Sequence, residues 1–83
     1  MAISTAERLI DEGILIRYAE RTKHLKCVEV LNKMSPQKQA LARLVISAVD
    51  RYPALMFQAI MDGWSATKIR FEINKKDRNK AIK

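Results

Sequence analysis

The chain has 83 residues, of which 48% are hydrophobic, and a net charge of +7. This length allows one domain, and the apolar content excludes a wholly disordered chain. The single cysteine excludes an internal disulfide, and no apolar run approaches the roughly 18 residues of a membrane span. The N-terminus also lacks the basic-then-apolar order of a signal peptide, so we expect a soluble cytoplasmic protein.

The first predicted helix covers residues 5–12. Ser4 is expected to cap it, and Glu7 stands at the spacing of a capping box. Gly13 is expected to end this helix, because glycine tolerates the left-handed conformation found at helix C-termini.

A second helix is predicted over residues 14–34. Segment 26–31, KCVEVL, also resembles a strand, because β-branched residues alternate there with Glu29. We prefer a helix, since the chain offers no second strand that could pair with it. The apolar residues of this region fall at helical spacing on one stripe: Ile14, Tyr18, Leu25 and Val28.

The third and fourth helices are predicted over residues 36–51 and 53–62. Ser35 and Pro36 mark the start of the third, and Tyr52 ends it because the residue before a proline disfavours helix. The third helix has a wide apolar face formed by Leu41, Leu44, Val45, Ala48, Val49 and Tyr52. The fourth is apolar nearly all round, which places it in the core or at an interface; its large residues are Leu55, Met56, Phe57, Ile60 and Met61.

A fifth helix is predicted over residues 65–76. Ser65 can cap it, and Trp64 can pack on Ile69 as a hydrophobic staple. Few apolar residues follow Ile73, so the segment beyond it is expected either to extend into solvent or to fray.

The predicted fold class is therefore all-α, a compact bundle of four to five helices. We expect a single helical domain over residues 1–73 and a basic C-terminal tail over residues 74–83. The scarcity of glycine and proline supports this class.

The residues do not favour an enzyme. His24 is the only histidine and is expected on the surface, while Cys27, three residues later, is more typical of a small buried hydrophobe than of a nucleophile. One histidine and one cysteine cannot complete a structural zinc site, and Gly13 and Gly63 are too far apart for a phosphate-binding loop. We expect no catalytic residue, metal, cofactor or small-molecule substrate.

Most of the positive charge lies at the C-terminus. Residues 68–83 hold seven basic side chains against Glu72 and Asp77, a net charge of +5, which leaves +2 for the first 67 residues. Such a segment attracts the phosphates of nucleic acids, although it could also serve only to keep the protein soluble. The predicted nucleic-acid-binding residues are Lys68, Arg70, Lys75, Lys76, Arg78, Lys80 and Lys83.

Residues 57–74 resemble part of a helix-turn-helix with Gly63 as the turn glycine. Ala59, Trp64 and Ile69 agree with that motif as its small, apolar and aliphatic positions. Three further core positions are polar here where the family is apolar: Gln58, Asp62 and Glu72.

A second register of the same motif begins at Ala66. Ile69 and Ile73 then occupy core positions, with Asn74 at the turn. Arg70, Lys75 and Lys80 would stand where the family has apolar or small residues, and the chain ends before a recognition helix is complete. Neither register fits the whole motif.

Large apolar residues near the C-terminus also favour a protein partner, because aromatic and methionine side chains are enriched at interfaces. We expect Phe57 and Met61 in the core rather than at an interface, whereas Trp64 and Phe71 suit either place. The predicted partner-binding residues are Trp64, Ile69, Phe71 and Ile73.

In overall type, a compact helical body followed by KIRFEINKKDRNKAIK resembles the small basic accessory regulators, including corepressors, that phages and plasmids encode. The resemblance implies transcription regulation, in which the protein stabilises a DNA-bound repressor on its operator. The expected partners are DNA phosphates, a DNA-binding protein such as a repressor, or both, and no membrane. Two alternatives are a protein-binding inhibitor or adaptor without nucleic-acid contact, and an RNA- or ribosome-associated basic protein. The second alternative ranks last, because the sequence offers no exposed aromatic platform or single-strand-binding module that would support it.

Overall fold

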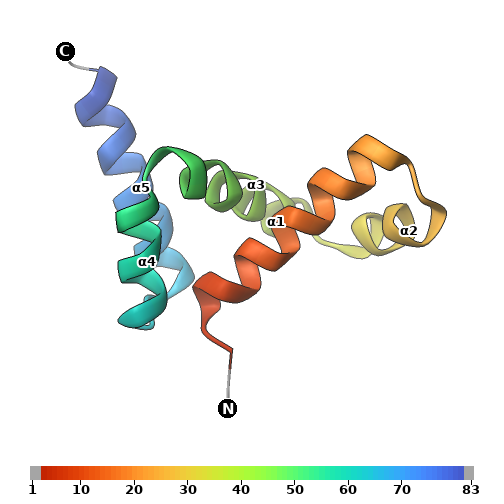
Figure 1. The fold of residues 1–83 in the computed structure, drawn as a ribbon, viewed down its shortest axis with the longest axis horizontal. Coiled ribbons are helices and arrows are strands. Elements are labelled where there is room, and N and C mark those ends of the chain that lie inside the picture. The colour runs from red at the N-terminus through yellow and green to blue at the C-terminus, as the bar shows by residue number, and fades with distance from the viewer. Residues whose placement is uncertain (1–2, 82–83) are drawn as a thin grey trace.

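A computed structural model describes residues 3–81, and within them the chain forms five α-helices and no strand (Figure 1). This confirms the predicted all-α bundle. The helices are α1 Thr5–Thr22, α2 Leu25–Lys33, α3 Pro36–Arg51, α4 Pro53–Met61 and α5 Ala66–Ala81.

Serine residues cap α1, α3 and α5, as the sequence predicts. In each case the serine hydroxyl accepts a hydrogen bond from the backbone amide three residues later, which satisfies a donor that the helix itself leaves free. The distances are 3.1 Å from Glu7 to Ser4, 3.2 Å from Lys38 to Ser35 and 3.2 Å from Lys68 to Ser65.

The predicted helix end at Gly13 is wrong, because α1 continues through this residue to Thr22. Gly13 is buried where α1 meets α3. A Cβ atom on Gly13 would lie 2.6 Å from Cβ of Ile46 and 2.8 Å from the carbonyl oxygen of Ala42. The glycine therefore serves the close approach of two helices rather than a helix end.

The predicted helix over residues 14–34 is divided in two. Lys23 adopts the left-handed conformation, with φ of 59°, and ends α1. The Thr22 hydroxyl secures this end by donating to the carbonyl of Tyr18 at 2.8 Å and accepting from the amide of His24 at 3.3 Å. Helix α2 follows, which confirms a helix rather than a strand for KCVEVL.

The predicted apolar stripe from Ile14 to Val28 is also wrong. Ile14, Tyr18 and Leu25 are exposed, and Val28 is only half-buried. The break at Lys23 places Leu25 and Val28 on a different helix, and Ile14 and Tyr18 lie on a side of α1 that does not face the core. Helix α1 instead buries the face that contains Gly13: Ala6, Leu9, Gly13, Ile16 and Ala19.

The core lies where α1, α3, α4 and α5 meet, and Figure 1 shows α2 at the opposite end of the molecule. Helix α3 contributes the apolar face predicted for it, with Leu41, Val45 and Ala48 buried and its other members half-buried. The main cluster of buried residues is Ala6, Leu9, Leu41, Val45, Ala48, Met56, Ala59, Ile69 and Ile73.

Helix α4 begins and ends at the residues that the sequence marks. Pro53 starts it at an angle of 118° to α3. At its end the amide of Trp64 donates to the carbonyl of Ala59 at 3.1 Å, and the amide of Gly63 donates to Ile60 at 3.4 Å. Gly63 has φ of 63°, so this is the glycine-containing C-cap known as a Schellman motif.

Within residues 3–81, no single helix has both the length and the apolar character needed to cross a membrane. Helices α3 and α4 reach that length and composition only as a pair, across their 118° bend.

Candidate nucleic-acid interface

Helix α5 is held against the core by one face. Ile69 and Ile73 are fully buried, and Trp64, just before the helix, packs half-buried against the same cluster. Of the four residues predicted to bind a protein partner, Ile69 and Ile73 thus present no surface in this structure. Phe71, by contrast, is 50% exposed on the other side of the helix.

Helix α5 is longer than predicted. It continues without a break across residues 73–74, where the sequence suggested that a tail begins, and it reaches Ala81, the last described residue, rather than ending near residue 76. The Tyr52 hydroxyl donates to Oδ1 of Asp77 at 2.5 Å, and Arg51 forms an ion pair with the same oxygen. Polar contacts therefore hold the C-terminal half of α5 against the corner between α3 and α4.

The contact between Tyr52 and Asp77 changes the acidity of both groups. The hydrogen bond from Tyr52, helped by the Arg51 guanidinium, lowers the pKa of the Asp77 carboxyl below its ordinary value. The hydrogen bond to the Asp77 carboxylate, helped by desolvation, raises the pKa of the Tyr52 hydroxyl. Near neutral pH the pair is therefore a phenol bonded to a carboxylate, with a guanidinium beside them.

The solvent-facing side of α5 bears a line of cations with one aromatic ring, which we name the α5 stripe. It consists of Lys68, Phe71, Lys75 and Arg78, all exposed. Their spacings of three, four and three residues place them on one side of a helix. Lys68 also holds its ammonium group 4.9 Å from the centre of the Trp64 ring, a cation–π contact at the start of the stripe.

The structure brings together only some of the predicted nucleic-acid-binding residues. Lys76 and Lys80 are exposed but form a separate line four residues apart on α5. Arg70 lines a pocket between α5, α1 and α3 instead of joining the α5 stripe. Lys83 lies outside the described residues.

An open hollow of about 480 Å³ borders the α5 stripe. It is lined by Phe71 and Arg78 of the stripe together with Asn74 and Asp77. Beside the Phe71 ring, the Arg78 guanidinium and the Asn74 amide can donate hydrogen bonds to phosphate or to base edges, while the Asp77 carboxylate is paired with Arg51 and Tyr52.

Two apolar residues expected in the core are on the surface of α4. Phe57 is 63% exposed and Met61 is 67% exposed, one turn further along the same helix. The prediction failed because a helix that is apolar on every side has no pattern that points to its buried face. That face contains Met56 and Ala59.

A second group of exposed apolar and basic side chains lies on α1, at the start of the apolar stripe that the sequence predicted. Ile14 and Tyr18 alternate there with Arg17 and Arg21 around a hollow of about 260 Å³. Arg17 is engaged in an ion pair with Asp50 at 3.2 Å. The spacing of the two arginines, four residues apart, is the signal that could have identified this face as solvent-exposed.

The candidate residues for other chemistry lie apart from these surfaces. His24 is exposed, as predicted, and Cys27 is half-buried rather than fully buried. Among residues 3–81, no three side chains of histidine, cysteine, aspartate or glutamate gather where they could hold a metal ion.

Comparison of the chain with protein-family models, with curated proteins and with solved structures gives no match.

Proposed function

We propose that this chain is a cytoplasmic, non-enzymatic accessory regulator that acts within a protein–DNA complex, in the manner of a corepressor. The α5 stripe contacts DNA phosphates, and a neighbouring surface contacts a DNA-bound protein such as a repressor. The observation that supports this proposal most is that the exposed side of a firmly packed helix bears Lys68, Lys75 and Arg78 around Phe71.

The geometry of α5 suits a contact with DNA. Lys68 and Arg78 are ten residues apart, so the stripe extends about 15 Å along the helix axis. Because Ile69 and Ile73 fix the opposite face in the core, little conformational entropy is lost when the stripe binds. The exposed ring of Phe71 can make apolar contact with a thymine methyl group or a sugar, while the cations pair with phosphates.

A salt series measures this contact directly. With three cations on phosphates, the logarithm of the affinity should fall against the logarithm of salt concentration with a slope of about −2.7. Replacing Lys68, Lys75 and Arg78 by glutamine should remove most of this slope. The matched control replaces three exposed cations on other helices, Arg21, Lys26 and Lys33, by glutamine as well. It should leave most of the slope unchanged.

The two triple variants carry the same net charge, so they separate a localised contact from a general attraction. Equal loss in both would mean that total charge, not the α5 stripe, attracts DNA. If the unmodified protein shows no binding even at low salt, direct DNA contact is excluded.

A second candidate, a protein-binding inhibitor or adaptor without nucleic-acid contact, is supported by the exposed pair Phe57 and Met61 on α4. Exposed aromatic and methionine side chains one helical turn apart are typical anchors for a partner. Affinity capture with the double variant Phe57→Ser and Met61→Ser, compared with the α5 stripe variant, distinguishes the adaptor from the DNA-binding regulator. A partner that is lost with this variant, yet retained by the stripe variant in the absence of DNA, would support the adaptor.

A further inference from the structure

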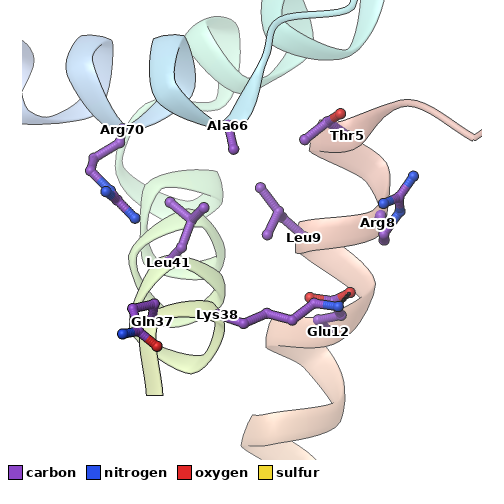
Figure 2. A pocket seen from close by; sticks show the side chains of 9 residues that line it. All are labelled: Thr5, Arg8, Leu9, Glu12, Gln37, Lys38, Leu41, Ala66 and Arg70. Carbon is purple, nitrogen blue, oxygen red and sulfur yellow. Dashed lines mark ion pairs between the residues drawn. The ribbon is translucent and has the colours of Figure 1, made fainter. Parts of the chain in front are cut away.

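A pocket of about 260 Å³ lies where the first turns of α1, α3 and α5 converge (Figure 2). Its floor is apolar, because Leu9 of α1, Leu41 of α3 and Ala66 of α5 point toward one another across it. No pair of these residues is close in sequence, so the pocket exists only through the packing of three helices.

The rim of the pocket is charged. Nζ of Lys38 lies 3.2 Å from Oε1 of Glu12, and Figure 2 shows this ion pair crossing one side of the pocket from α3 to α1. Arg8 and Arg70 also line the pocket, and neither takes part in any ion pair within residues 3–81. Three cations against one carboxylate leave a net charge of +2 around an apolar floor.

Arg70 is the rim cation best placed to bind a ligand. In Figure 2 its guanidinium extends toward Leu41, beside the floor. A guanidinium presents paired N–H donors that match the two oxygens of a carboxylate. Because no carboxylate within residues 3–81 pairs with Arg70, these donors are available to a molecule in the pocket.

We propose that this pocket binds a small organic carboxylate whose apolar part is a single ring or a short branched chain. The carboxylate pairs with Arg70, and the apolar part rests on Leu9, Leu41 and Ala66. The volume lies just below the roughly 300–1,000 Å³ of sites for drug-sized molecules, which limits the ligand to a small one. A largely apolar floor also disfavours a doubly charged phosphate, whose desolvation costs more than that of a carboxylate.

This ligand site is independent of the proposed DNA contact. Arg70 is on a different side of α5 from the stripe, so binding in the pocket and binding through Lys68, Lys75 and Arg78 can be measured separately. Because the ligand would touch three helices at once, it binds the folded protein only. Its binding should therefore raise the melting temperature as its concentration increases.

Nuclear magnetic resonance of the full chain tests the proposal, with benzoate and 3-methylbutanoate as probes. Both should cause saturable shifts of the backbone amides of Leu9, Leu41 and Arg70. Acetate lacks the apolar part, benzyl alcohol lacks the charge, and inorganic phosphate lacks the apolar part and carries more charge. Each of these three compounds should bind at least about tenfold more weakly than benzoate.

Two variants and one control assign the binding to this pocket. Arg70→Gln should weaken benzoate binding about tenfold or more, while Lys75→Gln, on the α5 stripe, should leave it unchanged. Ala66→Leu should fill the pocket and abolish the shifts, with the amide spectrum and melting temperature confirming that this variant is folded. The proposal is overturned if neither probe saturates at millimolar concentration, if Arg70→Gln binds like the unmodified protein, or if phosphate or benzyl alcohol binds as tightly as benzoate.

Discussion

The hydroxyl of Tyr52 donates a hydrogen bond of 2.5 Å to Oδ1 of Asp77, and so joins the corner between α3 and α4 to the C-terminal half of α5. Arg51, beside Tyr52, pairs with the same carboxylate and also lies 5.0 Å from the centre of the Tyr52 ring. Three side chains thus fasten a part of α5 that has no buried apolar residue after Ile73. Without them, the last turns of the helix would extend from the domain unsupported.

Replacing Asp77 by alanine should loosen these last turns without unfolding the protein. Hydrogen exchange of the amides of residues 77–81 should become faster, because the helix end then opens on its own. Asn79→Ala, which is exposed on the same segment, is the control and should leave exchange unchanged or slower, since alanine favours helix. Unchanged exchange in the Asp77 variant would contradict the fastening role.

The same carboxylate gives the stability of the protein a dependence on pH. Because the pKa of Asp77 is lowered in the folded state, its contribution is fully present above its unfolded value, 3.8, and is lost as the pH falls through the lower folded value. Urea unfolding of the protein and of Asp77→Asn should therefore differ at neutral pH. The two unfolding midpoints should approach each other as the pH falls below 3.8. A difference that stays constant down to pH 2 would show that ionisation of Asp77 is not its source.

Gly13→Ala should destabilise the protein, although alanine is favoured over glycine inside a helix by about 1 kcal/mol. The new Cβ would lie 2.6 Å from Cβ of Ile46, so α1 and α3 must separate, at a cost of about 1–3 kcal/mol. Ile46→Ala cannot relieve the clash, because alanine keeps the same Cβ atom. Chemical denaturation measures both single variants and the double variant. A Gly13→Ala protein that is more stable than the original would contradict the close approach of the two helices.

Gly63→Ala should also destabilise the protein, but for a conformational reason. No atom lies within 4 Å of the position where a Cβ would be, so the cost comes only from φ of 63°, at about 1–2 kcal/mol. Asparagine tolerates this conformation better, and Gly63→Asn should recover part of the loss in the free energy of unfolding. Equal costs for both substitutions would indicate a packing effect instead.

Ile73 lies on the buried side of α5, whereas Phe71 lies on its exposed side. Ile73→Ala should lower the free energy of unfolding by about 2–5 kcal/mol, because the side chain is fully buried. Phe71→Ser should change it by no more than about 0.5 kcal/mol, as for other surface substitutions, while weakening any contact made by the α5 stripe. A large loss of stability in the Phe71 variant would place this ring in the core instead.

Much of the local structure follows from the sequence, because short-range contacts decide it. The hydroxyls of Ser4, Ser35 and Ser65 each reach an amide three residues away, so the starts of α1, α3 and α5 need no information from the rest of the chain. The same holds for the corner at Pro53 and the turn at Gly63. These signals were sufficient to predict an all-α fold and the element that bears the C-terminal cations.

Only the tertiary structure decided which faces are buried. Gly13 carries the same local signal as a helix-ending glycine, yet it lies inside α1, where a Cβ atom would collide with Ile46, 33 positions later. Helix α4 is apolar on every side, but only one side packs against the core. Phe57 and Met61 lie on another side and are therefore exposed. In both cases a residue's place depends on the docking angle of another helix, which no nearby residue determines.

The candidate sites were likewise predicted only in part from the sequence. The sequence located the cations of the α5 stripe only as members of a larger basic segment, and it predicted that they would be spread around the helix rather than aligned on one side. It did not show that Arg70 leaves this set to face Leu9 and Leu41, nor that Asp77 would meet Tyr52, because each meeting joins residues more than twenty positions apart. Helix formation depends on neighbours in the chain, whereas a pocket between three helices depends on how their faces pack together.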